Sequence, residues 1–203
     1  GLLLTRLMRG GELPEAPLHV DSPMAAEATR IYLRYLQDRS LDDDLPDRLF
    51  ERKVKFHRTS AESKHLNDLP GPRVIIAANG MLTGGRVLHH LLRLLPDPDA
   101  LICLVGYQAP GTRGRALLEG APTVRMHGRD VPVRARVLDV HGLSGHADAD
   151  ELVRWVRSGG EAPPQVFVTH GELEASRALA GRLEKELGAR CVVPAVGESR
   201  ELE

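Results

Sequence analysis

Residues 74–105 read VIIAANGMLTGGRVLHHLLRLLPDPDALICLV, and this stretch decides the fold of the chain. It begins with the apolar run Val74–Ala78, a pattern typical of a parallel strand that is buried on both faces. Glycine-rich residues follow, then a helix predicted over residues 85–95, and then a second apolar run at Leu101–Val105, which predicts another buried strand. A strand, a helix and a strand in this order predict an α/β fold with a mainly parallel sheet flanked by helices.

The rest of the chain alternates in the same way. Strands are predicted at residues 18–20, 54–56, 124–126, 131–137, 166–168 and 191–193, and helices at residues 2–8, 23–37, 59–66, 112–119, 149–157 and 172–187. Residues 127–130 join two of these strands as a β-hairpin, and the acidic, turn-rich residues 38–50 indicate a surface excursion. Thr59 and Glu62 have the spacing of a capping box, which predicts the start of the helix at residues 59–66.

The composition sets limits on the class of protein. A length of 203 residues suits one ordinary domain or two small ones, and with 42% hydrophobic but 3% aromatic residues the core must be aliphatic. The net charge of −1 does not by itself indicate a nucleic-acid binder, although arginines can form a local basic surface. No signal peptide or membrane-spanning run is visible in the sequence, so we expect a soluble, cytoplasmic protein without membrane contact.

The cysteines and the start of the chain give two further expectations. Cys103 and Cys191 lie in apolar runs without Cys-x-x-Cys spacing, which predicts buried, reduced thiols. The first residue is Gly1, and an amphipathic pattern follows it directly. We therefore expect the chain to be a fragment of a longer protein.

His170 lies where a predicted strand gives way to a helix. It follows the apolar run 166–168, and the carboxyl ends of parallel strands are where α/β proteins bind ligands. An imidazole at this place suits zinc ligation or acid–base chemistry. A capping or surface histidine is the alternative, which the residues alone leave open.

His146 occupies a similar junction, within the sequence HGLSGHAD at residues 141–148. Ser144 offers a hydroxyl and Gly145 a backbone N–H, and both suit a phosphate at a helix N-terminus. Ordinary N-capping by Ser144 or Asp148 is the alternative. Two such junctions in successive α/β units favour a site.

Two other segments are candidates for phosphate or RNA contact. Gly84 and Gly85 lie in a strand–loop–helix junction that matches neither a Walker A loop nor a dinucleotide-binding motif. Arg113 and Arg115 lie near a predicted helix start, where they either meet phosphate or form plain surface.

The remaining histidines are read as structural. His89 and His90 lie in mid-helix, so one should face the sheet and the other the solvent. No constellation is apparent for four further histidines, which are His19, His57, His65 and His127.

Three longer segments resemble one family. Residues 77–91 (AANGMLTGGRVLHHL) look like the Gly-Met-x-x-Gly-Gly segment of β-CASP proteins, and residues 105–115 (VGYQAPGTRGR) resemble their Gly-Tyr-Gln-Ala-x-Gly-Thr-x-Gly-Arg segment. Residues 20–25 (VDSPMA) are similar to their Asp-Ser-Pro-Met-Ala segment. The resemblance covers nearly the whole chain. Asn79 departs from it, because many bacterial relatives have Ser there.

This resemblance implies a ribonuclease with a metallo-β-lactamase fold, in which two zinc ions activate a water that attacks an RNA phosphodiester, as an endonuclease, a 5′-exonuclease or both. His146 falls on the family's motif B, which implies a catalytic role beside the scissile phosphate. His170 falls on motif C, which implies a zinc ligand and favours RNA over DNA. Ser144 resembles a phosphate-contacting serine of the family.

The family's His-x-His-x-Asp-His motif does not occur in these 203 residues. The resemblance therefore implies a β-CASP domain at residues 1–141, followed at residues 142–203 by the C-terminal strand–helix segment of a metallo-β-lactamase αββα fold. We expect the chain alone to hold no zinc stably and to be inactive. Its exposed apolar surfaces should be covered by the missing N-terminal metallo-β-lactamase half or by a second copy, as a homodimer.

Two other functions remain open. One is a non-catalytic RNA-binding or scaffolding subunit of an RNA-processing complex. The presence of both His146 and His170 argues against this alternative. The other is an unrelated α/β domain that binds an anion. The reading frame upstream of Gly1 would discriminate the first of these from the enzyme.

Overall fold

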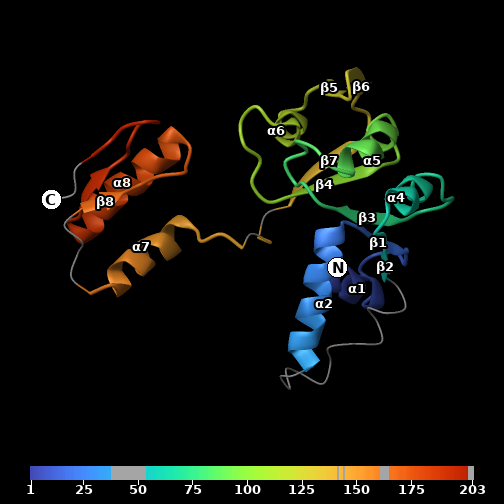
Figure 1. Cartoon of the computed structure of the whole chain (residues 1–203), viewed down its shortest axis with the longest axis horizontal. Helices are drawn as coiled ribbons and strands as arrows, with labels where there is room; N and C mark the ends of the chain where they lie inside the picture. Colours follow the sequence, from blue (N-terminus) through green and yellow to red (C-terminus); the bar gives the residue numbers. More distant parts are fainter. Residues whose placement is uncertain (38–53, 141, 144, 161–164, 201–203) are drawn as a thin grey trace. The chain divides into compact units, whose positions relative to one another are not determined.

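The computed structural model describes residues 1–37, 54–140, 142–143, 145–160 and 165–200 (Figure 1). The chain forms two compact units, Gly1–Leu143 and Ser144–Glu203, called below the N-terminal and the C-terminal unit. The surface excursion predicted at residues 38–50 lies outside the described residues. Across the described ranges, no helix combines the length and the apolar character needed to span a membrane.

The N-terminal unit begins with a parallel three-stranded sheet in the order β2-β1-β3. Its strands are β1 (Leu18–Asp21), β2 (Val54–Phe56) and β3 (Val74–Ala77), and its helices are α1 (Leu2–Arg9), α2 (Pro23–Gln37) and α4 (Ser60–Leu66). All four residues of β1 are buried, because both faces of this central strand are covered. The predicted capping box is present: the Thr59 hydroxyl accepts from the Glu62 N–H, and the Glu62 carboxylate accepts from the Thr59 N–H.

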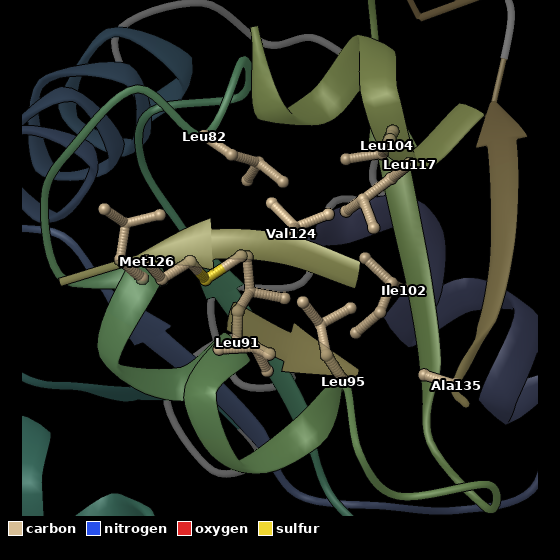
Figure 2. Packing of buried hydrophobic residues seen from close by; sticks show 11 residues of the cluster. Leu82, Leu91, Leu95, Ile102, Leu104, Leu117, Val124, Met126 and Ala135 are labelled. Atoms are coloured by element: carbon tan, nitrogen blue, oxygen red, sulfur yellow. The ribbon is translucent and has the colours of Figure 1, made fainter. Parts of the chain in front are cut away.

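A second parallel pair completes this unit. The pair consists of β4 (Leu101–Val105) and β7 (Arg136–Val140). The other elements of this part are the helices α5 (Val87–Leu94) and α6 (Arg113–Leu118) and a hairpin of β5 (Thr123–Met126) and β6 (Arg129–Pro132). The hairpin turn is His127-Gly128, and both residues have positive φ, as a tight two-residue hairpin turn requires. Apolar side chains from α5, strand β4 and the hairpin meet in one cluster (Figure 2).

The structure corrects three predictions in this region. Strand β4 is covered on one face alone: Ile102 and Leu104 are buried, whereas Leu101, Cys103 and Val105 are exposed. Cys103 is therefore not the buried thiol that its apolar surroundings predicted. The strand predicted at residues 131–137 is two strands, β6 and β7. A short apolar run reads the same whether one face or both faces are covered, so the sequence could not separate these cases.

The C-terminal unit repeats the alternation with α7 (Ala149–Ser158), β8 (Gln165–Phe167), α8 (Leu173–Leu187) and β9 (Arg190–Val192). Strands β8 and β9 pair in parallel. The core of this unit is small and aliphatic, formed by Val153, Val168, Ala180 and Leu183. Together with the parallel pairs of the first unit, it confirms the predicted α/β class with mainly parallel strands. The predicted division at residues 141 and 142 stays a prediction.

Candidate functional site

Both candidate histidines lie in the C-terminal unit, in exposed positions just ahead of a helix. His170 follows β8 and precedes α8, whose N-cap is Glu172. Its backbone has a φ of +65°, which is uncommon for a residue other than glycine. The junction therefore holds the histidine in a constrained conformation at the carboxyl end of a parallel strand, where ligand-binding groups are expected.

Gly171 explains how this junction is built. A Cβ at this position would lie 2.7 Å from the Ser176 hydroxyl oxygen, which is closer than van der Waals contact allows. Ser176 is buried in the first turns of α8, and its N–H donates to the Glu172 carbonyl at 2.8 Å. The glycine therefore lets α8 start directly behind His170.

His146 lies outside the cap of its helix. Asp148 is the N-cap of α7: its carboxylate accepts from the Glu151 N–H at 2.8 Å, and the Glu151 carboxylate accepts from the Asp148 N–H at 3.0 Å. The capping alternative thus belongs to Asp148. No atom lies within 4 Å of the position that a Cβ on Gly145 would take. Ser144 lies outside the described residues.

The described ranges do not form a metal site by themselves. They contain no group of three or more His, Cys, Asp or Glu side chains that could hold a metal ion. A stable zinc site needs at least three protein ligands. A zinc ion therefore does not fit these residues alone, and His170 can supply at most one ligand to a site whose other ligands come from elsewhere.

The glycine-rich loop (residues 79–86) connects β3 to α5 in the N-terminal unit. Asn79 and Leu82 have φ values of +73° and +58°, and Gly85 also lies in the left-handed region. The Asn79 side-chain oxygen accepts from the Thr83 N–H at 3.1 Å and from the Thr83 hydroxyl at 3.0 Å. Left-handed residues other than glycine cost conformational energy, so contacts must hold this loop in shape.

Arg113 supplies several of these contacts. Its Nη1 donates to the Leu82 carbonyl at 3.1 Å and to the Thr83 carbonyl at 3.4 Å, and its Nε donates to the Arg125 carbonyl at 2.6 Å. The guanidinium that the sequence marked as a phosphate contact thus binds protein carbonyls. Arg115 forms an i,i+4 ion pair with Glu119 at 2.6 Å on the surface of α6.

The loop is polarised by these contacts. Its carbonyl oxygens at Asn79, Met81, Leu82, Thr83 and Gly85 accept hydrogen bonds from the protein. Within the part of the chain that the structure describes, the N–H groups of Gly84 and Gly85 donate to no protein acceptor. Carbonyls directed to the protein and N–H groups left to solvent favour contact with an anion.

Arg86, the last residue of this loop, belongs to a group of hydrogen-bonded side chains that we call the polar cluster: Asp21, Ser63, Asn67, Arg86 and His90. Asp21 is 1% exposed at the end of β1. Its carboxylate accepts from the Ser63 hydroxyl at 2.5 Å, from Arg86 Nη1 at 2.8 Å and from His90 Nε2 at 2.7 Å. His90 Nδ1 lies 2.6 Å from the Asn67 side-chain oxygen.

The polar cluster keeps its carboxylate ionised. Burial raises the pKa of Asp21, but the hydrogen bonds from Ser63, His90 and Arg86 together outweigh burial and lower this pKa below its ordinary value. The three donors compensate the charge of the buried carboxylate. Removal of one of them would leave this charge only partly compensated and would lower the stability of the fold by several kcal/mol.

The structure also shows where the other histidines lie. Of the two in mid-helix, one is buried and the other exposed, as predicted; the buried one is His90 and the exposed one is His89. His19 and His57, however, form a pair in which His19 Nδ1 lies 2.9 Å from His57 Nε2. The rings of His89 and His127 stack at 4.7 Å between centroids. These two contacts bring His19, His57 and His127 into pairs that the sequence did not indicate.

Two family models match this chain. The model described as the Beta-Casp domain matches residues 2–117, and the model described as the Zn-dependent metallo-hydrolase RNA specificity domain matches residues 130–194. The second range includes His146 and His170, and the first includes the glycine-rich loop and Arg113.

Curated relatives agree with these matches. A ribonuclease of Thermus thermophilus is 38% identical over 97% of this chain and 46% of its own length. An RNase J-like protein of Methanocaldococcus jannaschii is 31% identical over 97% of this chain and 45% of its own length, and a transcription termination factor FttA of Pyrococcus abyssi is 32% identical over 89% and 29%. The chain thus spans about half the length of the first two relatives. Since the Beta-Casp model covers more than half of its residues, the chain belongs to the β-CASP family.

Proposed function

We propose that this chain is part of a zinc-dependent ribonuclease that hydrolyses RNA phosphodiester bonds. The observation that carries the proposal is the coincidence of family and geometry in the C-terminal unit. There, two histidines lie at strand-to-helix or loop-to-helix junctions, inside the range that matches an RNA specificity domain. RNA as the substrate is supported by that description and by the ribonuclease names of the relatives.

The proposed roles follow the resemblance residue by residue. His146 is the catalytic side chain beside the scissile phosphate, and its exposure outside the α7 cap leaves the imidazole accessible from solvent. His170 contributes one imidazole to a zinc site whose other ligands come from the rest of the longer protein. Ser144 and Gly145 contact phosphate next to His146, and the open space around Gly145 is compatible with such an approach.

In the N-terminal unit, the proposed phosphate contacts are Gly84 and Gly85, together with Arg113 and Arg115. The polarity of the glycine-rich loop supports the two glycines most directly, because their N–H groups have no protein acceptor in the described ranges. Arg113 also stabilises the loop, because its guanidinium donates to the Leu82 and Thr83 carbonyls. Arg115 is held by Glu119 at the surface of the same helix.

Catalysis, in this proposal, requires more than this chain. The curated relatives are about twice as long, and a metallo-β-lactamase half would supply the remaining zinc ligands. The exposed apolar residues Leu101, Val105 and Leu138 are compatible with coverage by that half or by a second copy in a homodimer. A cytoplasmic location without membrane contact belongs to the same proposal.

The first test uses the 203-residue chain on single-stranded RNA, with a longer protein that contains it as the reference. We expect the chain to bind RNA, to retain no zinc after desalting and to cleave nothing, because it lacks the ligands for a catalytic ion. Binding is measured by fluorescence anisotropy, zinc by elemental analysis, and cleavage on gels with and without chelator.

Cleavage by the chain alone that a chelator abolishes would contradict this account. The alternative is a non-catalytic RNA-binding or scaffolding subunit of an RNA-processing complex. If the longer protein also binds RNA without cleaving it, that alternative is correct.

A further inference from the structure

Arg86, the last residue of the glycine-rich loop, connects elements that are distant in the sequence. Its Nη1 donates to Asp21 Oδ1 at 2.8 Å and to the His57 carbonyl at 3.1 Å, and its Nη2 donates to the Arg58 carbonyl at 2.7 Å. One guanidinium thus joins the end of β1 and the segment after β2 to the loop that follows β3. These contacts use the planar, multiple-donor geometry that distinguishes arginine from lysine.

The contacts of Arg86 lie at the carboxyl end of the parallel sheet. Asp21 ends β1, His57 follows β2, and the glycine-rich loop follows β3, in a sheet of order β2-β1-β3. The crevice beyond the carboxyl ends of parallel strands is the usual place for a ligand in α/β folds. Arg86 therefore fixes the position of the loop relative to the strand ends at this edge.

Hydrogen bonds from two different parts of the N-terminal unit fix the conformation of the loop. On one side, Arg113 donates to the Leu82 and Thr83 carbonyls, and the Gly114 N–H donates to the Met81 carbonyl at 3.2 Å. On the other side, Arg86 binds Asp21 and so connects the loop to the rest of the polar cluster. Because Asn79 and Leu82 hold left-handed conformations, the loop would relax if either side were released.

We propose that Asp21 is a positioning residue for RNA binding, which acts through Arg86 to hold the glycine-rich loop with the Gly84 and Gly85 N–H groups available to a phosphate. This inference rests on the proposed RNA function. Asp21 has a side-chain exposure of 0%, so it cannot itself touch RNA, whereas the Arg86 side chain is 22% exposed and has a route to solvent. Without the buried carboxylate, the guanidinium would gain more from water than from the cluster, and the loop would lose its second hold.

The test variant is Asp21→Asn, which keeps the size of the side chain and removes its charge. The matched control is Asp68→Asn, since Asp68 pairs with Arg93 of α5 at 2.9 Å on the surface, with side-chain exposures of 62% and 59% for Arg93 and Asp68. Two quantities are measured on the 203-residue chain: hydrogen exchange of peptides from residues 79–86, and affinity for single-stranded RNA as a function of salt. Circular dichroism establishes that each variant is folded.

For Asp21→Asn, we expect exchange in residues 79–86 to accelerate about tenfold or more. RNA affinity should fall about tenfold without a decrease in the slope of log affinity against log salt, because the lost contacts are uncharged N–H groups and no cationic side chain is removed. A loss of stability alone would accelerate exchange throughout the N-terminal unit, whereas release of the loop accelerates it in residues 79–86. The control should match the unsubstituted chain in all three measurements.

Arg86→Lys is the second variant, in case Asp21→Asn does not fold. Lysine keeps the charge but cannot bind Asp21 and both carbonyls at once, so exchange and affinity should lie between those of the unsubstituted chain and the fully released loop. A folded variant with unchanged exchange in residues 79–86 would overturn the positioning role. If the unsubstituted chain does not bind RNA, the proposed function fails there, while the exchange data still decide whether Asp21 holds the loop.

Discussion

Leu95→Ala is expected to lower the free energy of unfolding of the N-terminal unit by about 2–5 kcal/mol. Leu95 is 0% exposed and lies in the apolar cluster with Leu91 and Ile102 (Figure 2). Truncation removes the transfer free energy of the buried methyl groups and leaves a cavity between α5 and strand β4 that the surrounding side chains refill only in part. The backbone role of this residue survives, because its carbonyl accepts from the Arg134 and Ala135 N–H groups.

The control is Leu101→Ala, the same chemical change on a residue of β4 that is 49% exposed. It should change stability by no more than about 0.5 kcal/mol. Urea unfolding should be followed by circular dichroism, since the chain's single tryptophan, Trp155, lies in the C-terminal unit and reports on that unit instead. Equal losses for the two variants would contradict the buried position of Leu95 and the exposed position of Leu101.

Acidification is expected to cost the N-terminal unit up to about 3 kcal/mol between about pH 6.5 and about pH 4. Burial, with smaller contributions from the charges of His57, Lys55 and Arg73, lowers the pKa of His19 from 6.5 to about 4. The unfolded chain therefore takes up this proton at a higher pH than the folded chain does. The stabilisation is complete above the unfolded pKa and is lost as the pH falls toward the folded one.

Asp21 adds a separate loss of stability at a lower pH than His19 does. Its folded pKa is lowered, so its contribution is present above its unfolded pKa of 3.8 and disappears as the pH falls below that value. The measurement is the free energy of unfolding at several pH values between about 7.5 and about 4.5, for the unsubstituted chain, for His19→Gln and for His65→Gln. His65 is exposed and serves as the control. The His19 variant should have a flatter profile; a slope equal to that of the control would contradict the assignment.

Much of the fold is predictable because its signals are local. The alternation of apolar runs with amphipathic segments predicted the strands and helices, and Thr59 and Glu62 marked the start of α4 by their spacing alone. The exposure of Cys103 was not predictable in this way. It depends on which face of β4 other elements cover, and that is a property of the tertiary arrangement.

The candidate site divides along the same line. His146 and His170 could be placed ahead of their helices because each junction is encoded within a few residues. The polar cluster escaped sequence reasoning, since Asp21 meets Ser63, Arg86 and His90 across 42, 65 and 69 residues of chain. The bonds from Arg113 to the Leu82 and Thr83 carbonyls were not predictable either, because a basic residue near a helix start carries no sign of the carbonyls that it will meet in the fold.

The central claim is that His146 and His170 serve RNA hydrolysis in a longer protein that contains this chain. Its most direct test measures the cleavage rate of that protein with His146→Ala, with His170→Ala and with the exposed control His65→Ala, at saturating single-stranded RNA. The account predicts a loss of about a hundredfold or more for each of the first two variants and an unchanged rate for the control. A rate for His146→Ala and His170→Ala equal to that of the unsubstituted protein would contradict it.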